Sequence, residues 1–300
     1  MNVLILVVTY NRKPILSQCL QAIFSQTYSN FRILVVDNGS TDGTRTYLSS
    51  LEETGKISAL FLNKNLGGAG GFSAGMKEAM RLGYSHIWMM DDDTIPTPNA
   101  LEKLICADQL LSSYGFLVSL PVWKDGSLCK MNLPLLGSVF SEPAAILESG
   151  LIPVKKATFV SFFIRSDIIR QLGLPIKEFF LWGDDQEYTE RISTKYPSYL
   201  VTGSIVLHLM NSNVGSDLSS DSSIRISRYF YAYRNELYIS KKKGILSLGY
   251  YFFRAFLIFF KIIFFAPDQR LSRIHFLCRG IISGIFFHPE IEFYANPPFD

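Results

Sequence analysis

Short apolar runs recur along the first part of the chain. Met1–Thr9 contains six consecutive apolar residues, and similar runs occupy Phe31–Val36, Ile57–Leu62 and His86–Met90. Continuous apolar runs of this length are typical of strands that are buried on both faces of a sheet. We therefore predict four such strands.

Helical patterns separate these runs. Apolar residues recur at helical spacing from Ile15 to Phe24, and further helices are predicted near Thr41–Glu53 and near Phe72–Leu82. The glycine-rich segment Gly67–Gly71 is predicted to form a turn that precedes the third helix. Strands and helices that alternate in this way predict an α/β fold with a mixed, mainly parallel sheet flanked by helices.

The pattern is less regular after residue 93. A helix is expected near Pro98–Leu104 and another from Leu181 through Arg191, and residues 123–156 give no pattern. Further strands are predicted at Phe116–Val122, Ala157–Ile164 and Leu200–Leu207, the last ending at His208. A stretch rich in Ser, Asn, Asp and Gly at residues 211–223 predicts a loop and a domain boundary.

The C-terminal part is aromatic and basic, and it is predicted to be helical. Tyr250–Phe265 is almost entirely apolar but contains Arg254 and Lys261, so it fails the requirement that a spanning helix keep charges out of its centre. Residues 241–279 hold eight basic side chains and one acidic one. A basic face on such a helix favours a position in the membrane interface, attracted to anionic lipid. The alternative is a helix that packs on its own domain or on another subunit.

Composition narrows the class of protein. Apolar residues make up 48% of the chain, which excludes a mainly disordered protein, and charged residues make up only 18%. The net charge of +3 is too small to indicate nucleic acid as a partner. The four cysteines form no CxxC motif and the first residues lack a signal-peptide pattern, so we expect a reducing, cytoplasmic location.

Polar clusters follow the predicted strands, at Thr9–Arg12, Asp37–Ser40, Asn63–Gly71 and Asp91–Asp93. In open parallel sheets, ligands bind outside the carboxyl ends of the strands. The four clusters therefore predict one shared crevice.

The acidic triplet Asp91–Asp93 is a candidate metal site. Adjacent carboxylates repel one another unless a cation neutralises them. Residues two apart in an extended strand face the same way, so Asp91 and Asp93 are expected to point together while Asp92 points elsewhere. Two such oxygens suit Mg²⁺ or Mn²⁺ shared with a phosphate-bearing substrate. The alternative is an acidic turn that caps the helix after it.

A second acidic pair, Asp184-Asp185, follows Trp182. One of these carboxylates is a candidate general base that takes a proton from an attacking hydroxyl, and Trp182 offers an apolar face on which a sugar can stack. The alternative is that both carboxylates favour the dipole of a helix N-terminus. His208, at the end of its strand, is either a metal ligand or a structural histidine.

Four sequence blocks together resemble the inverting family 2 glycosyltransferases of the GT-A fold. The blocks are Val7–Arg12, Val35–Thr44, Asn65–Phe72 and Met90–Asp93, and with Trp182–Arg191 the resemblance covers roughly residues 1–210. The glycine-rich block and the triple aspartate look more like galactofuranosyltransferases than like the average member, and rhamnosyltransferases are near neighbours.

The resemblance implies a role for each matching residue. Asp91 and Asp93 match the metal motif, which His208 joins, and the acidic pair supplies the base, with Asp185 expected ahead of Asp184. The extra Gly183 departs from the family pattern, so the resemblance alone does not decide whether Asp184 or Asp185 is the base. Trp182 is the expected acceptor contact. The expected donor-binding residues are Thr9, Tyr10, Arg12, Asp37, Asn38, Asn65, Gly67, Gly68, Asp91 and Asp92, with Thr9, Asp37 and Asn65 on the nucleoside and Arg12 on the diphosphate.

The resemblance also implies a domain layout. A GT-A catalytic domain is expected at residues 1–215, with nucleotide-sugar binding in about 1–93 and the acceptor and catalytic part in about 94–215. A helical, membrane-associating region is expected at 224–300.

The implied activity is transfer of a sugar, with inversion, from UDP-galactofuranose to a hydroxyl of a lipid-linked glycan in cell-surface polysaccharide synthesis. The alternative donor is dTDP-rhamnose. The enzyme is expected to act as a peripheral protein on the inner face of the plasma membrane, with Mg²⁺ or Mn²⁺ as cofactor.

Two other classes of protein remain as alternatives. A phosphohydrolase with a DxD nucleophile would need a threonine where Ile95 stands. A non-catalytic membrane adaptor would make no use of the set formed by Asp37, Asp91, Asp93 and Asp185.

Overall fold

The computed structural model describes residues 1–140, 142–210 and 212–294. A ten-stranded sheet forms the centre of these residues, in the order β3-β2-β1-β4-β9-β6-β10-β8-β7, with β5 paired to β10. The strands are β1 (Val3–Thr9), β2 (Phe31–Asp37), β3 (Ser58–Phe61), β4 (His86–Asp91), β5 (Thr94–Pro96), β6 (Phe116–Val122), β7 (Leu135–Leu136), β8 (Leu151–Lys156), β9 (Phe162–Arg165) and β10 (Tyr199–His208).

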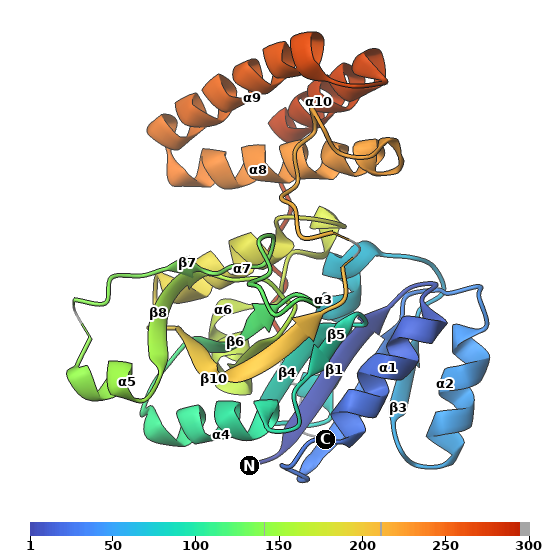
Figure 1. The fold of residues 1–300 in the computed structure, drawn as a ribbon, viewed down its shortest axis with the longest axis vertical. Helices are drawn as coiled ribbons and strands as arrows, with labels where there is room; N and C mark the ends of the chain where they lie inside the picture. Colours follow the sequence, from blue (N-terminus) through green and yellow to red (C-terminus); the bar gives the residue numbers. More distant parts are fainter. Residues whose placement is uncertain (141, 211, 295–300) are drawn as a thin grey trace.

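Helices cover both faces of this sheet, and three more form a separate layer at the C-terminal end (Figure 1). The helices are α1 (Lys13–Phe24), α2 (Thr44–Glu53), α3 (Gly67–Arg81), α4 (Ala100–Leu110), α5 (Ala144–Glu148), α6 (Ser166–Leu172), α7 (Asp184–Ser193), α8 (Tyr229–Lys243), α9 (Ile245–Phe265) and α10 (Arg270–Ile285), with short 3-10 helices η1 (Lys177–Phe179) and η2 (Ser223–Arg228).

The sheet is mixed and mainly parallel on its N-terminal side, as predicted. β1 pairs in parallel with both β2 and β4, and β2 pairs in parallel with β3. β9 lies antiparallel between β4 and β6, and β6 then pairs in parallel with β10. The four strands predicted from the first apolar runs therefore lie side by side and end at one edge.

The continuous apolar run of β1 has a physical reason, because both of its faces are covered. Val3, Ile5 and Val7 belong to the core beneath α1, α2 and α4, whereas Leu4 and Leu6 belong to the core beneath α3, α6 and α7. Successive side chains of a strand point to opposite faces, so each residue needs an apolar side chain.

Three predicted elements differ from the structure. α3 begins at Gly67 instead of near Phe72, so the glycine-rich segment forms its first turns instead of a turn before it. The helix expected from Leu181 begins at Asp184. Of the strand predicted at Ala157–Ile164, only the last three residues lie in β9, because the chain leaves β8 and turns there before it re-enters the sheet.

The glycines of α3 allow close packing on β1. A Cβ atom on Gly71 would lie 2.5 Å from a Val8 methyl carbon, and one on Gly75 would lie 2.4 Å from Leu6 Cδ1. A side chain at either position would push α3 away from the sheet. Gly71 and Gly75 are therefore required for the packing of α3 on the sheet. Gly67 and Gly68, at the start of the same helix, remain candidate ligand contacts.

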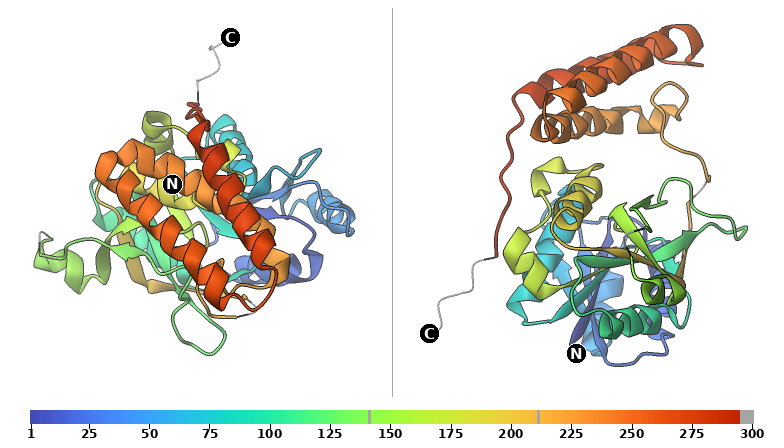
Figure 2. Two further views of the ribbon diagram at one scale, coloured as in Figure 1. Left: turned by 90° about the horizontal axis from the view of Figure 1, so that it is seen from above. Right: turned by 90° about the vertical axis from the view of Figure 1, so that its left-hand side faces the viewer.

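The C-terminal region, residues 224–294, packs as a layer of its own. α10 packs against α8, and the wholly buried Arg273 donates to the carbonyls of Leu218 and Asp221, at the entry to this region. After α10 the chain runs back along the outside of the sheet domain (Figure 2), where Glu292 pairs with Lys77 and Lys177. The region is thus tied to the rest of the protein at both of its ends.

The structure changes the prediction for the apolar helix. α9 is 21 residues long with a mean hydropathy of 1.7, and among the described residues it is the one helix long and apolar enough to cross a membrane. By length and composition α9 therefore meets the requirement for a spanning helix although it carries two charges. These charges also do not form an outward basic face, since Arg254 pairs with Glu236 on α8 and Lys261 pairs with Asp217.

Candidate active site

Three neighbouring parallel strands deliver polar side chains to one edge of the sheet. The register aligns Thr9, the last residue of β1, with Asp37 at the end of β2, and Val8 with Asp91 at the end of β4. The predicted crevice therefore has its floor at this edge, as expected for an open parallel sheet.

Asp91, Asp93 and His208 come together as a candidate metal centre. One ligand atom from each lies within 4.8 Å of the other two, and His208 Nε2 is 3.0 Å from Asp93 Oδ1. The antiparallel pair of β5 and β10 aligns His208 with Thr94 and so brings it beside the acidic turn, although it is far away in sequence. Two carboxylates and one imidazole are a donor set that suits Mn²⁺ or Mg²⁺.

Asn132 orients the histidine, and no motif or pattern in the sequence predicted this role. Its Nδ2 donates to Thr158 Oγ1, which leaves Oδ1 as the acceptor for the proton on His208 Nδ1, 3.0 Å away. The second ring nitrogen, Nε2, hydrogen-bonds Asp93 Oδ1 at 3.0 Å, and on losing its proton it would offer its lone pair to an ion in place of that bond. A ligand histidine commonly has such a partner on its other nitrogen.

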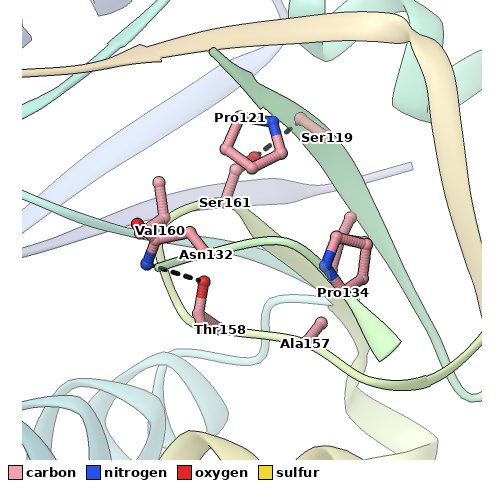
Figure 3. A pocket seen from close by; sticks show the side chains of 9 residues that line it. Ser119, Pro121, Asn132, Pro134, Ala157, Thr158, Val160 and Ser161 are labelled. Carbon is pink, nitrogen blue, oxygen red and sulfur yellow. Dashed lines mark hydrogen bonds between the residues drawn. The ribbon is translucent and has the colours of Figure 1, made fainter. Parts of the chain in front are cut away.

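A small pocket of about 10 Å³ adjoins this histidine partner (Figure 3). Asn132 and Thr158 line one part of it, and the hydrogen-bonded hydroxyls of Ser119 and Ser161 line another. The pocket is therefore polar and lies next to the candidate metal centre.

Asp92 turns away from the metal centre, as predicted. It accepts hydrogen bonds from Thr9 Oγ1 at 2.7 Å and from Arg12 at 3.1 Å. Arg12 also donates to Asp93 at 2.7 Å. The guanidinium expected on a diphosphate thus already lies at the acidic turn, beside the position where an ion and a diphosphate would meet.

The three aspartates have different proton affinities. Burial raises the pKa of Asp91 to about 7, and the charge of Asp93 adds to this. Burial also raises the pKa of Asp92, to about 6, against the charge of Arg12. Burial opposes ionisation of Asp93 too, but its hydrogen bond with His208 and the charges of His208 and Arg12 outweigh it and lower its pKa to about 2. Neighbouring positive charge therefore decides which carboxylate stays ionised.

The acidic pair lies at the start of α7 and close to this centre. Asp184 is buried, and the charge of Asp91 helps to raise its pKa well above the ordinary value, after burial and the charge of Asp185. Asp184 and Asp91 therefore stand within electrostatic reach of one another, on one side of the molecule. Asp185 Oδ1 accepts from the amide of Gln186 at 2.7 Å.

The residues expected on the nucleoside side join β2 to α3. Asp37 is buried and accepts from the Ser40 amide at 2.9 Å. Asn38 accepts from the Leu66 amide and donates to the Gly67 carbonyl, and Asn65 Oδ1 accepts from the Gly67 amide at 2.7 Å. These side chains fix the loop that borders the crevice.

The two glycines expected at the donor differ in their surroundings. A Cβ on Gly67 would lie 1.9 Å from the Phe180 carbonyl oxygen, whereas one on Gly68 would meet nothing within 4 Å. Only glycine fits at position 67, because the Phe180 carbonyl occupies the space of a side chain. At Gly68 that space is open, so a ligand can approach the backbone there. Tyr10 is exposed at the end of β1.

Trp182 lies between the two parts of the protein. Its ring meets the Tyr229 ring edge-on at 4.9 Å between centroids, and the Arg225 guanidinium lies 5.5 Å from its centre. Residues of the C-terminal region thus border the crevice beside the acidic pair.

The fold and the acidic centre define the class of protein: a GT-A transferase that uses a nucleotide sugar. Residues 4–123 match Glycosyl transferase family 2. The chain is 25% identical over 268 residues to galactofuranosyltransferase GlfT1 of Mycolicibacterium smegmatis, covering 82% of this chain and 88% of the relative. This chain is therefore a glycosyltransferase that carries a family 2 domain.

Solved structures support the fold. Residues 1–349 of S. aureus TarS in complex with UDP match with a TM-score of 0.55 and 14% identity, over 96% of this chain and 72% of that chain. GalNAc-T7 with UDP, GalNAc and Mn²⁺ matches with a TM-score of 0.57 and 14% identity, over 82% of this chain and 52% of that chain. The chain spans 44% of the longer TarS chain. The match to Glycosyl transferase family 2 argues against the phosphohydrolase alternative.

Proposed function

We propose that the chain transfers galactofuranose from UDP-galactofuranose to a hydroxyl of a lipid-linked glycan, with inversion. One observation carries this proposal: Asp91 of β4 and Asp93 of the turn before β5 gather with His208 at one sheet edge, within electrostatic reach of Asp184 on α7. The relative from Mycolicibacterium smegmatis, named a galactofuranosyltransferase, supports the choice of sugar.

The donor occupies the N-terminal half of the crevice in this proposal. Asp37 and Asn65, with Thr9, hold the nucleoside, and Arg12 moves from the acidic turn to the diphosphate. Tyr10, Asn38 and the backbone of Gly67 and Gly68 complete the donor site. Asp91, Asp93 and His208 hold Mg²⁺ or Mn²⁺, which would offset the negative charge on the departing diphosphate.

Asp185 is the proposed general base. It takes the proton from the acceptor hydroxyl, whose oxygen then forms the new bond to the anomeric carbon. The bond between that carbon and the diphosphate oxygen breaks, and the diphosphate leaves with the electron pair. The oxygen attacks from the side opposite the leaving group, so the configuration inverts. A well-placed base contributes about 10²–10⁴-fold to such a step.

The C-terminal part supports a membrane location. α9 is apolar and largely exposed, and it belongs to the helical layer at the C-terminal end of the protein (Figure 2). We assign residues 1–215 to catalysis, with Trp182 on the acceptor, and residues 224–300 to attachment at the inner face of the plasma membrane.

A donor panel tests the function. Purified protein with membranes and Mn²⁺ is given UDP-galactofuranose, dTDP-rhamnose, UDP-galactose or UDP-glucose, and release of the nucleoside diphosphate is measured with and without acceptor membranes. We expect acceptor-dependent release from UDP-galactofuranose that chelation abolishes. Preference for dTDP-rhamnose would replace the donor assignment, and no acceptor-dependent release from any donor would overturn the proposal.

A further inference from the structure

The segment just before the acidic pair has an unusual backbone. Phe180, Trp182 and Gly183 have φ values of 63°, 63° and 88°. Residues with a side chain rarely adopt positive φ, and such conformations persist only where the surroundings hold them. The segment Phe179–Gly183 is therefore held in place by other parts of the protein.

Asn235 of α8 holds this segment from one side. Its Nδ2 lies 3.0 Å from the Phe179 carbonyl oxygen, 3.2 Å from that of Leu181 and 2.7 Å from that of Trp182. The side chain is 0% exposed, so no water substitutes easily for the amide. Buried carbonyl groups require a donor, and the two N–H groups of this side-chain amide lie within reach of three of them.

α3 contacts the segment Phe179–Gly183 on the side opposite Asn235, and Arg234 of α8 contacts its beginning. The Ala69 amide donates to the Phe180 carbonyl at 3.2 Å, and Gly67 admits that carbonyl because it has no side chain. Arg234 donates to the carbonyls of Glu178 and Phe179 at 2.7 and 3.0 Å. The segment is thus fixed between the sheet domain and the C-terminal region.

α8 is itself fixed within its layer. Tyr251 of α9 donates to the Tyr233 carbonyl at 2.9 Å. Gly280 and Gly284 let α10 approach closely, since a Cβ on Gly280 would lie 2.8 Å from the Phe230 carbonyl oxygen. The position of Asn235 therefore depends on the packing of all three helices.

We propose that Asn235 is a positioning residue for sugar transfer: by holding the carbonyls of Phe179, Leu181 and Trp182, it sets where Asp184 and Asp185 stand. The C-terminal region is then part of the active site as well as an attachment to a membrane. This inference rests on the proposed role of the acidic pair in transfer.

The geometry gives the proposal a specific kinetic signature. The candidate donor and metal residues come from β1, β2, β4, β10, the start of α3 and the loops that join these elements, and the hydrogen bonds of Asn235 go to none of them. Loss of these hydrogen bonds should therefore lower kcat and leave nucleotide affinity nearly unchanged. A displacement of about 1 Å at a catalytic group can cost about 10²-fold in rate.

The test compares Asn235→Ala and Asn235→Ser with Asn30→Ala. Asn30 also donates to a main-chain carbonyl, that of Met1, but at the far end of β2 from the crevice. Serine keeps one donor, so it provides a milder variant where alanine prevents folding. In the full-length protein, amide exchange of residues 179–186, UDP affinity with Mn²⁺ and kcat for transfer are measured.

We expect faster exchange at 179–186 in both Asn235 variants, UDP affinity within about twofold of wild type, and kcat lowered about 10²-fold in alanine and less in serine. Asn30→Ala should match wild type in all three. Unchanged exchange, unchanged kcat, or a loss of UDP affinity equal to the loss of kcat would overturn the proposal. Absence of transfer by the wild type with every donor would instead count against the proposed function, while the exchange result still tests the hydrogen bonds.

Discussion

Asp184 and Asp185 are neighbours in the chain but differ in their electrostatic surroundings. Burial, the charge of Asp185 and the charge of Asp91 raise the pKa of Asp184 well above its usual value, so this carboxyl is hard to ionise. Burial raises the pKa of Asp185 only to about 6, because the Gln186 amide and Lys156 favour its charged form. Asp185 is therefore the member of the pair that is ionised near neutral pH and able to accept a proton.

Substitution of the pair distinguishes the two roles. We expect Asp185→Asn to lower kcat by about 10²–10⁴-fold, since the base is lost, with UDP affinity unchanged. Asp184→Asn should have a smaller effect, because burial and two neighbouring negative charges already disfavour the charged form of this carboxyl. Transfer at saturating donor measures both. A larger loss in Asp184→Asn than in Asp185→Asn would reverse the assignment of the base.

The pH dependence of transfer follows from the same carboxylate. A base with a pKa of about 6 becomes protonated as the pH falls through that value, so kcat should fall on the acid side of about pH 6. Lys156 lowers this pKa through its positive charge, so Lys156→Gln should move the acid limb to higher pH. A kcat profile of both proteins measures this shift. An acid limb that Lys156→Gln leaves in place would exclude Asp185 as its source.

Asn132 offers a test of the metal centre that leaves its three ligands intact. Asn132→Ala removes the acceptor for His208 Nδ1, so the imidazole loses its fixed orientation. Loss of such a partner typically weakens metal binding by about 10–100-fold. Calorimetric titration of the protein with Mn²⁺ measures this, with Asn30→Ala as the control. Equal Mn²⁺ affinity in all three proteins would show that Asn132 does not orient a ligand.

At the scale of elements, α3 allows the same substitution at two sites with opposite consequences. Gly71→Ala places a methyl group 2.5 Å from Val8 and should destabilise the fold by about 1–3 kcal/mol. Gly68→Ala meets open space in the same helix, and alanine favours a helix by up to about 1 kcal/mol over glycine. Thermal unfolding should therefore show a lower Tm for Gly71→Ala only. Reduced UDP affinity in a stable Gly68→Ala would place the donor at that backbone.

Elements buried on both faces could be predicted from the sequence, and elements defined by distant contacts could not. β1, β2 and β4 carry unbroken apolar runs because helices cover both of their faces, and the topology then brings their polar ends together. β8 lies toward the edge of the sheet and includes Pro153, so residues 123–156 carried no clear period. Asn132 and Asn235 acquire their roles from partners more than 50 residues away, which no local pattern records.

At the scale of the whole molecule, the layer of α8, α9 and α10 stands over the edge where the parallel strands end, with α8 nearest to the sheet domain (Figure 1). Arg254 and Lys261 of α9 are half-exposed and pair with acidic partners, and the aromatic side chains Phe253, Phe256 and Phe264 are exposed. An exposed apolar surface of this kind marks an interaction site. Because its charges are internally paired, α9 should bind lipid mainly through apolar contact instead of through attraction to anionic headgroups.

Vesicle sedimentation tests this mode of attachment. Full-length protein should sediment with neutral phosphatidylcholine vesicles as well as with anionic ones, and high salt should release little of it, because salt screens charge but not apolar burial. Burial of a phenylalanine contributes about 1.5–3 kcal/mol, so the double variant Phe253→Ser, Phe256→Ser should bind at least about 10²-fold more weakly. Phe24→Ser, an exposed phenylalanine on α1, is the matched control and should sediment like wild type. Binding confined to anionic vesicles and lost in salt would show that basic residues outside the internal ion pairs, such as Lys242, attach the protein to the membrane.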